Sequence, residues 1–281
     1  MATDGTRIIA IGGANGGAHG NIRWTTWSGT AAGVEETPQS FYAFGGWGAG
    51  ELVDAVVTPQ GDAILGTWGG AQAGLDAAVW LPANDVWTRQ DPAGTALEST
   101  KELLVGPRSA TTSGPGIVVA GSAIHLGDGS VAQLATLWRS SAPNAGWRRI
   151  DLPDAGRHSE AVSATCDGLR CTVAGQVDGV LAIWQVDGDR AVRVTGLPVF
   201  SVGDSDPVPR PLLLAGHQVQ ITTEGGRSTV LTEYGSGWAR STGPDGIPVG
   251  AALAGDRLYV VVSSRAGAPA SLWQTDARKW N

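Results

Sequence analysis

The chain of 281 residues has few lysines and no basic cluster. Lys101 and Lys279 are its two lysines, and Arg148-Arg149 is its single pair of adjacent arginines. The formal net charge is −7. Binding to a nucleic-acid backbone or to an anionic membrane surface needs clustered Lys and Arg. We therefore expect neither nucleic acid nor an anionic membrane as a partner.

Long apolar runs are also absent from the sequence. No stretch reaches the roughly 18 apolar residues of a membrane span, and no amphipathic apolar run has helical length. The first residues, Met1-Ala2-Thr3-Asp4-Gly5, lack the basic and apolar regions of a signal peptide. We expect no membrane insertion, and a protein that is either cytoplasmic or numbered after removal of its leader.

Only two cysteines are present, and their spacing is informative. Cys166 and Cys171 bracket Asp167-Gly168-Leu169-Arg170, and Asp-Gly is a strong tight-turn signal. The two thiols then face each other near a hairpin end, within reach of a disulfide. Two free buried thiols are the alternative, and a metal site is disfavoured because no third Cys or nearby His supplies ligands. A disulfide implies an oxidising compartment, so we expect a secreted or cell-surface protein.

Turn-forming residues and tryptophan are abundant. The chain has 42 Gly, 15 Pro and 12 Trp, and 42% of its residues are hydrophobic, which is enough for a core. The turn formers are spread along the whole chain, so no low-complexity segment stands out. The bias toward arginine, alanine and glycine is typical of a high-GC genome such as that of an actinobacterium.

A degenerate repeat runs through the sequence. A pattern of two hydrophobic residues followed by Trp recurs, and Val230-Leu231-Thr232 fits the same slot with Thr in place of Trp. Spacings of 41 to 58 residues separate the repeats and belong to propellers and other arrays. The tryptophans of the pattern are Trp24, Trp80, Trp138, Trp184 and Trp273.

Each repeat predicts four short strands. In the second repeat these are Leu52–Thr58, Ala63–Thr67, Ala77–Leu81 and Val86–Arg89, with turn residues between them. Six such units predict an all-β, six-bladed β-propeller of four-stranded antiparallel blades in a single domain. A two-sheet sandwich or a solenoid is the alternative. The expected blades span approximately 1–48, 49–106, 107–158, 159–206, 207–247 and 248–281.

The two terminal blades are short in this pattern. Blade one has almost no first strand, and blade six has only the start of a fourth. Three explanations stay open: a longer native chain, pairing of the two stubs with Trp280 over the seam, or a donor strand from another chain that completes blade one.

One segment resembles a known repeat. Ser140 and Trp147 keep the outer spacing of the Asp-box hairpin of sialidase or BNR repeats, with Ala142 in place of its Asp and Asn144 in place of its Gly. The resemblance implies a propeller of that kind. It does not imply sialidase activity, because the family's arginine triad and Tyr–Glu pair find no match in this sequence.

Candidate binding residues lie on the loops expected over the central channel. Long loops in compact domains tend to be functional. Clustered aromatic side chains in Phe41–Trp47 suggest stacking on sugar rings or docking of a partner, or the plugging of a blade seam. The candidate ligand-binding residues are Tyr42, Trp47, Trp68, His125, His158 and Arg108.

Three functions remain open from the sequence. The favoured one is a secreted, non-catalytic propeller that binds a glycan or a protein. The first alternative is a carbohydrate-active hydrolase or lyase with carboxylates in the central pocket, and the second is a scaffold subunit completed by another chain. No catalytic residue, metal or cofactor is indicated. The carboxylates expected to face the channel are Glu51, Asp54, Glu98, Glu102, Asp128, Glu160 and Glu224.

Overall fold

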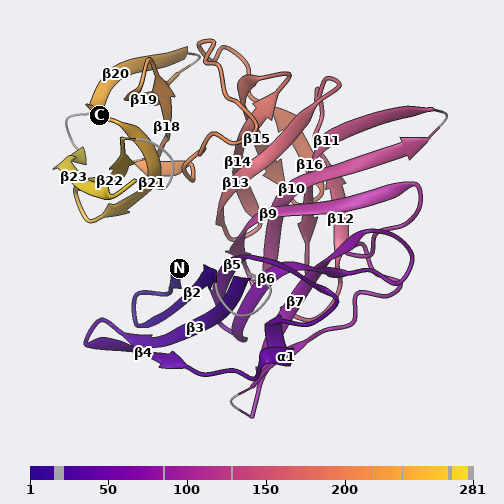
Figure 1. Ribbon diagram of the computed structural model, residues 1–281. Helices are drawn as coiled ribbons and strands as arrows, with labels where there is room; N and C mark the ends of the chain where they lie inside the picture. The colour runs from indigo at the N-terminus through magenta and orange to yellow at the C-terminus, as the bar shows by residue number, and fades with distance from the viewer. Residues whose placement is uncertain are drawn as a thin grey trace.

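The computed structural model describes residues 1–15, 22–84, 86–127, 129–214, 216–235, 237–264 and 268–277. Six antiparallel sheets fan out around a central axis, each built from strands that follow one another in the chain (Figure 1). This arrangement is a six-bladed β-propeller and confirms the predicted fold class. The helix of the described part is one turn, α1 (Phe41–Phe44), between blades one and two.

The strands of the first three blades follow the predicted order. Blade one contains β1 (Ala2–Thr3), β2 (Arg7–Asn15), β3 (Ile22–Thr30) and β4 (Gly33–Thr37). Blade two contains β5 (Ala49–Thr58), β6 (Gly61–Gly69), β7 (Leu75–Ala83) and β8 (Val86–Arg89). Blade three contains β9 (Leu103–Ser113), β10 (Gly116–Gly127), β11 (Ser130–Arg139) and β12 (Arg148–Asp151).

The remaining blades complete the ring. Blade four contains β13 (Ser159–Asp167), β14 (Arg170–Val177), β15 (Val180–Asp187) and β16 (Arg190–Arg193). Blade five contains β17 (Leu212–Leu214), β18 (His217–Glu224), β19 (Arg227–Tyr234) and β20 (Gly237–Asp245). Blade six contains β21 (Ile247–Ala254), β22 (Arg257–Ser263) and β23 (Ala270–Asp276), three strands in the described part of the chain.

The repeated tryptophan packs blade against blade. Trp80, Trp138 and Trp184 are at most 1% exposed. In blades two, three, four and six this tryptophan pairs with the residue three positions after the start of the second strand, for example Ile64 of β6 or Val119 of β10. In blade one this position belongs to Trp27, which pairs with Ala10 in the strand that begins at Arg7. The assignment of Trp24 to the repeat is therefore wrong. The hydrophobic pattern fits Trp24, three residues before the tryptophan that occupies the equivalent position in the ladder.

A β-bulge recurs on the innermost strand of four blades. The register shifts at Val53, Arg108, Val162 and Val249, each of which has no cross-strand partner. In three of these blades a glycine on the second strand lies opposite the bulge, because a Cβ at Gly66, Gly121 or Gly175 would stand 1.9–2.2 Å from a carbonyl oxygen of the inner strand. The glycines therefore let the two backbones approach where the inner strand bends toward the channel.

The disulfide favoured by the cysteine spacing is present. Cys166 and Cys171 pair directly across the β13–β14 ladder, and their sulfur atoms are bonded. No helix in the described residues is long and apolar enough to cross a membrane.

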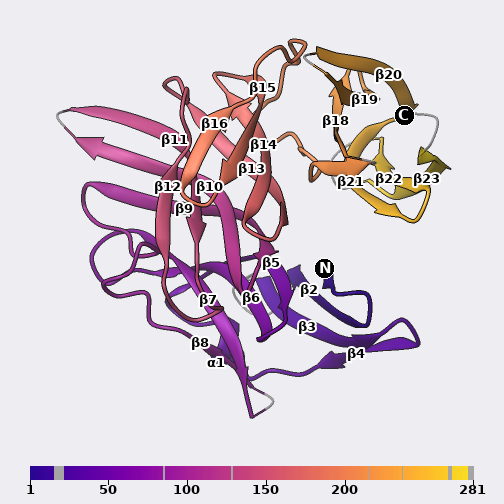
Figure 2. The ribbon, with the colours of Figure 1, turned by 180° about the vertical axis from the view of Figure 1, so that it is seen from behind.

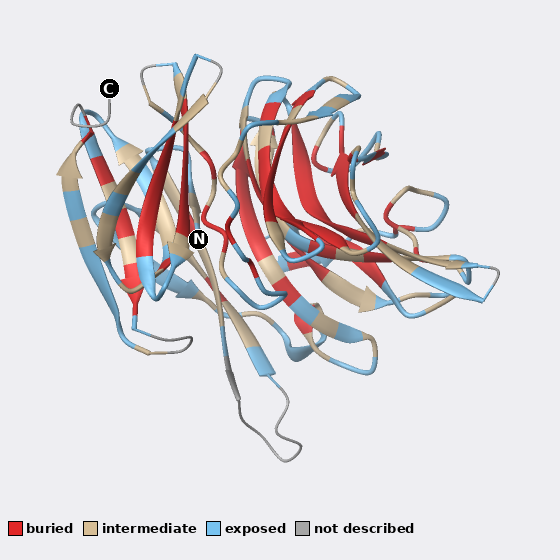
Figure 3. Cartoon of the chain, turned by 90° about the horizontal axis from the view of Figure 1, so that it is seen from above, coloured by how far each residue is buried: buried red, intermediate tan, exposed pale blue. Residues whose placement is uncertain are grey.

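Blades one and six do not share a strand within the described residues. β1 pairs with β2, and β21 pairs with β22, so the N-terminus lies toward the middle of the ring and blade six beside blade five (Figures 1 and 2). Trp280, expected over the seam, lies outside the described residues. Buried residues form long stretches in the strands far from the C-terminus, and shorter, interrupted ones beside it (Figure 3).

Candidate functional site

The innermost strands enclose a central cavity of about 780 Å³. β1, β5, β9, β13 and β21 line it together with residues 207–210 of the loop between blades four and five. Each of the four bulges lies in this lining. The bulge residue and its neighbour are Val53–Asp54, Arg108–Ser109, Val162–Ser163 and Val249–Gly250.

Asp54 is the most firmly held charge of the channel. Its Oδ1 accepts a hydrogen bond from the Ala55 backbone N–H at 2.9 Å, and its Oδ2 accepts one from the Ala110 N–H at 2.9 Å. Arg210 Nη2 donates to the same Oδ2 at 2.5 Å and to the Ala110 carbonyl at 2.7 Å. The carboxylate thus joins β5, β9 and the blade-four-to-five loop through these accepted hydrogen bonds.

A second arginine–carboxylate pair lies at the start of β13. Arg108 Nε is 3.2 Å from Glu160 Oε1, and Arg108 Nη2 donates to the Asp204 carbonyl at 3.5 Å. His158 Nε2 lies 2.9 Å from Asp204 Oδ1, which also receives Gln176 Nε2 at 3.5 Å. We call Arg108, His158, Glu160, Gln176 and Asp204 the mouth cluster.

Burial sets the protonation behaviour of Glu160. Its side chain is 11% exposed, and this desolvation raises the pKa of its carboxyl above the ordinary value. Arg108 opposes the rise, Asp204 adds to it, and His158 opposes it. The carboxyl of Glu160 therefore keeps its proton to a higher pH than an ordinary, exposed glutamate does.

The aromatic segment Phe41–Trp47 is exposed. Tyr42 is 82% exposed on α1, which contacts β3 and β8 of blades one and two. Trp47 is fully exposed, while the following residue, Gly48, accepts a hydrogen bond from the Gly69 N–H at 2.7 Å and so holds the loop to β6. Phe44 is the buried member of the segment and packs edge-on against Trp80.

A smaller pocket of about 200 Å³ opens beside α1. It combines a guanidinium, an amide and a hydroxyl with aromatic rings, a mixture suited to a small polar ligand with an apolar face. Its lining includes Arg23, Trp24, Gln39, Ser40, Phe41 and Phe44.

Trp68 lies beside the end of the aromatic segment, against Gly48, whereas His125 lies elsewhere. Trp68 is partly buried, with its ring centroid 6.2 Å from that of Trp80 and the Arg89 guanidinium 5.0 Å above it. His125 pairs through its backbone with Leu103 and Ala132, and its buried Nε2 has no partner in the described part of the chain. The structure thus brings Arg108 and His158 together through Asp204, places Trp68 beside the segment of Tyr42 and Trp47, and leaves His125 separate.

Sequence reasoning missed Arg210 and the pairing of the carboxylates. Arg210 lies 156 residues from Asp54, so no local spacing relates them. The bulge positions did carry a signal: Ile64-Leu65-Gly66, Val119-Ala120-Gly121 and Val173-Ala174-Gly175 share a hydrophobic–hydrophobic–glycine pattern. Of the predicted channel carboxylates, Asp128 lies outside the described residues.

Among the described residues no group of three or more His, Cys, Asp or Glu side chains is arranged to hold a metal ion. The two aspartates of the Gly203–Pro207 loop are engaged within the protein: Asp204 with His158, and Asp206 Oδ2 with the Gly203 N–H at 2.7 Å.

The chain matches no protein-family model and no curated protein sequence. Among solved structures, a mutant of the Aleuria aurantia lectin in complex with alpha-methyl-L-fucoside is similar, with a TM-score of 0.53, 15% identity, and coverage of 96% of this chain and 91% of that chain. A second structure of that lectin, described as a six-bladed β-propeller with a novel fucose recognition mode, has a TM-score of 0.52, 14% identity and the same coverage. At such identity the likeness shows the fold: the chain is a six-bladed β-propeller.

Proposed function

We propose that this protein is a non-catalytic, carbohydrate-binding β-propeller that takes a neutral glycan at the long-loop face, over the mouth of the central channel. The observation that carries the proposal is that two arginines of the channel lining, Arg210 and Arg108, each hold a carboxylate, Asp54 and Glu160 respectively. Paired in this way, the charges offer fixed donors and acceptors with little net charge. Such a surface suits hydroxyl groups better than an ion.

The arginine pairs also favour binding over catalysis. A glycosidase needs one carboxyl that gives up a proton and another that attacks or activates water. Asp54 already accepts hydrogen bonds from Arg210 and from two backbone N–H groups, so its carboxylate is held in place and most of its acceptor capacity is used. The mouth cluster supplies hydrogen-bond donors and acceptors for the glycan, and the exposed rings of Tyr42 and Trp47 offer a second, separate apolar surface.

Three further observations support the proposal. The two similar solved structures are of a fucose-recognising lectin, one of them with bound alpha-methyl-L-fucoside. The disulfide suits secretion or the cell surface, because disulfides persist in oxidising compartments. The segment with the Asp-box-like spacing makes the turn between β11 and β12, where Ser141 N–H donates to the Ala145 carbonyl at 3.1 Å. This turn supports repeats of the sialidase or BNR kind.

A glycan array probed with the full chain, followed by calorimetric titration of the best neutral oligosaccharide, tests the proposal. Arg108→Ala should weaken binding at least tenfold, which is a loss of about 1.4 kcal/mol of binding free energy. The matched control is Arg170→Ala, because Arg170 is exposed and paired with Asp187 at the hairpin of blade four. Equal effects of the two variants, or no glycan bound by the wild type, would contradict the proposal.

A second candidate function rests on Glu160. Its raised pKa is a property of general acids in glycoside cleavage. A hydrolysis screen against sugar conjugates separates the two candidates: turnover that Glu160→Gln abolishes would establish the enzyme and overturn the non-catalytic proposal. The donor strand expected at blade one stays a prediction, tested by the mass of the native assembly.

A further inference from the structure

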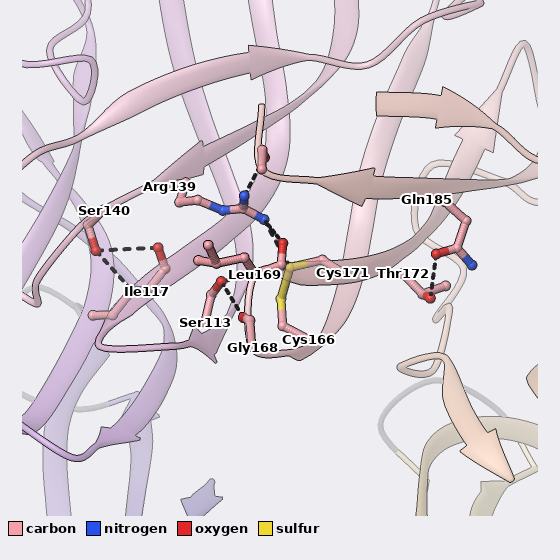
Figure 4. Close-up of a disulfide and its surroundings, with 11 residues drawn as sticks. Ser113, Ile117, Arg139, Ser140, Cys166, Gly168, Leu169, Cys171, Thr172 and Gln185 are labelled. Atoms are coloured by element: carbon pink, nitrogen blue, oxygen red, sulfur yellow. Dashed lines mark hydrogen bonds between the residues drawn. A yellow bond between two sulfur atoms is a disulfide. The ribbon is translucent and has the colours of Figure 1, made fainter. Parts of the chain in front are cut away.

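The two sulfur atoms of the disulfide have unequal surroundings (Figure 4). Cys171 is 1% exposed, on the side of β14 that packs into the core between blades three and four. Cys166 is partly exposed at the end of β13, next to a turn whose residues 167–170 are all exposed. A thiol from solvent therefore reaches the sulfur of Cys166 more readily than that of Cys171.

A buried arginine contacts the hidden sulfur. Arg139, at the end of β11 in blade three, is 2% exposed, and its Nη2 lies 3.3 Å from Cys171 Sγ. The same Nη2 donates to the Leu169 carbonyl at 3.0 Å, and Nη1 donates to the Gly188 carbonyl. Ser113 Oγ lies 4.0 Å from Cys171 Sγ on the other side.

This guanidinium has no carboxylate partner among the described residues. Asp187 and Asp189 are the acids that act on Arg139 electrostatically, and each forms an ion pair with an exposed arginine, Arg170 or Arg148. Arg139 Nε is also buried without an acceptor in the described part of the chain. A buried cation without a counter-ion is costly, and burial lowers the pKa of Arg139 accordingly.

We propose that Cys166–Cys171 is a thiol–disulfide exchange site, in which an external thiolate attacks Cys166 and Cys171 leaves as a thiolate stabilised by Arg139. The thiolate gives the buried guanidinium the counter-ion that the disulfide form lacks. A positive group beside a cysteine lowers the pKa of its thiol, and a leaving thiol of lower pKa departs faster. The same ion pair holds blade three to blade four once the covalent bond is open.

The exchange is balanced in atoms and electrons with an external dithiol as the reductant. Its first thiolate forms a bond to Cys166 Sγ while the Sγ–Sγ bond breaks, and the electron pair of that bond passes to Cys171 Sγ. The second thiolate of the dithiol then attacks the first sulfur of the same dithiol, which is bonded to Cys166 Sγ, and releases Cys166 as a thiolate. The protein cystine gains two electrons, and the dithiol is oxidised to a disulfide.

The site of attack is read directly in the wild-type protein. The full chain is treated with reduced glutathione, a monothiol, and free thiols are then blocked with N-ethylmaleimide under mildly acidic conditions, where exchange is slow. Trypsin cleaves after Arg170 and separates the two cysteines for mass spectrometry. We expect glutathione on Cys166 and the blocking group on Cys171, in at least tenfold excess over the reverse. Glutathione on Cys171, or on both in equal amounts, would overturn the proposal.

The role of Arg139 is read from thiolate absorbance near 240 nm, which needs no reagent access. Cys166→Ser leaves Cys171 as a single thiol, and Cys171→Ser leaves Cys166 as the matched control. We expect Cys171 to ionise at least one pH unit below the ordinary value of about 8.5, and Cys166 near that value. Adding Arg139→Met to Cys166→Ser should return Cys171 to the ordinary value or above, whereas Arg148→Met should not. Identical titrations of the two single thiols would refute the proposal.

Discussion

At the scale of single residues, buried polar groups in this propeller are held by partners from other blades. Arg210 reaches Asp54 from the blade-four-to-five loop, and Arg139 of blade three reaches the hairpin of blade four. The indole N–H of Trp80 donates to the Ala43 carbonyl at 2.7 Å. Such bonds stabilise one angle between neighbouring blades, because a buried group left without its partner costs about 1–3 kcal/mol.

Glu160 gives a pH-dependent prediction. The pKa of the Glu160 carboxyl is raised in the folded protein. As the pH rises, this carboxyl therefore loses its proton in the unfolded chain before it does so in the folded protein. Glu160 consequently contributes most to stability when it is protonated. Raising the pH from about 4 to about 7 should therefore favour Glu160→Gln increasingly over the wild type. Urea unfolding at both pH values measures this, and a difference that does not change with pH would contradict it.

The repeated tryptophan offers a matched pair of variants. Trp184 Nε1 donates to the Pro153 carbonyl at 2.9 Å, whereas Trp138 Nε1 has no partner among the described residues, although both side chains are fully buried. Trp184→Phe and Trp138→Phe remove similar volume. We expect the first to cost about 1 kcal/mol more free energy of unfolding, the value of one hydrogen bond. Denaturant titration of both variants checks this, and equal costs would show that the bond contributes nothing.

At the scale of elements, the recurring feature of the channel wall is a β-bulge on the innermost strand, opposite a glycine of the second strand. In blade three the bulge residue is Arg108, which has no cross-strand partner and lines the cavity beside Ser109. In blade three, the backbone of Gly121 lies so close to the Gly106 carbonyl that an added Cβ would overlap it. The atoms that a side chain at Gly121 would meet belong to the backbone of β9, which cannot move aside as a flexible side chain could.

Gly121→Ala tests this packing. Its Cβ would lie 2.0 Å from the Gly106 oxygen, so β9 and β10 must separate, at a cost of about 3 kcal/mol or more. Gly127→Ala on the same strand is the control, because a Cβ there meets nothing within 4 Å, and we expect a change below about 0.5 kcal/mol. Thermal unfolding measures both, and a tolerant Gly121→Ala would mean that the bulge relaxes freely.

At the scale of the whole molecule, stability is unevenly distributed around the ring. β14 and β15 are buried along most of their length, whereas most residues of β23 are exposed or half-buried and its outer side has no paired strand in the described residues. Edge strands with few buried contacts open with little free energy.

Hydrogen exchange resolved by segment tests this gradient. We expect backbone amides of β22 and β23 to exchange at least tenfold faster than those of β14 and β15 under native conditions. Figure 3 shows the difference in burial on which the expectation rests. Equal protection in both blades would indicate that the ring unfolds as one cooperative unit.

Much of the fold was predictable because it depends on local chemistry. Alternating apolar residues, turn glycines and the recurring tryptophan predicted the blades, and Asp167-Gly168 between two cysteines predicted the disulfide hairpin. The prediction for blade one was wrong because Trp24 and Trp27 both fit a hydrophobic pattern. Only the strand pairing shows which of the two occupies the repeat position.

The site was less predictable, for a physical reason. Hydrophobic periodicity determines which residues form strands, and here it determined six repeats around an axis. It contains no information about which side chains from different blades meet, since that depends on blade angles and on bulges that shift the register by one residue. Only the tertiary structure therefore decided that Asp54 faces Arg210, that Arg108 faces Glu160, and that Tyr42 and Trp47 stand apart from both pairs.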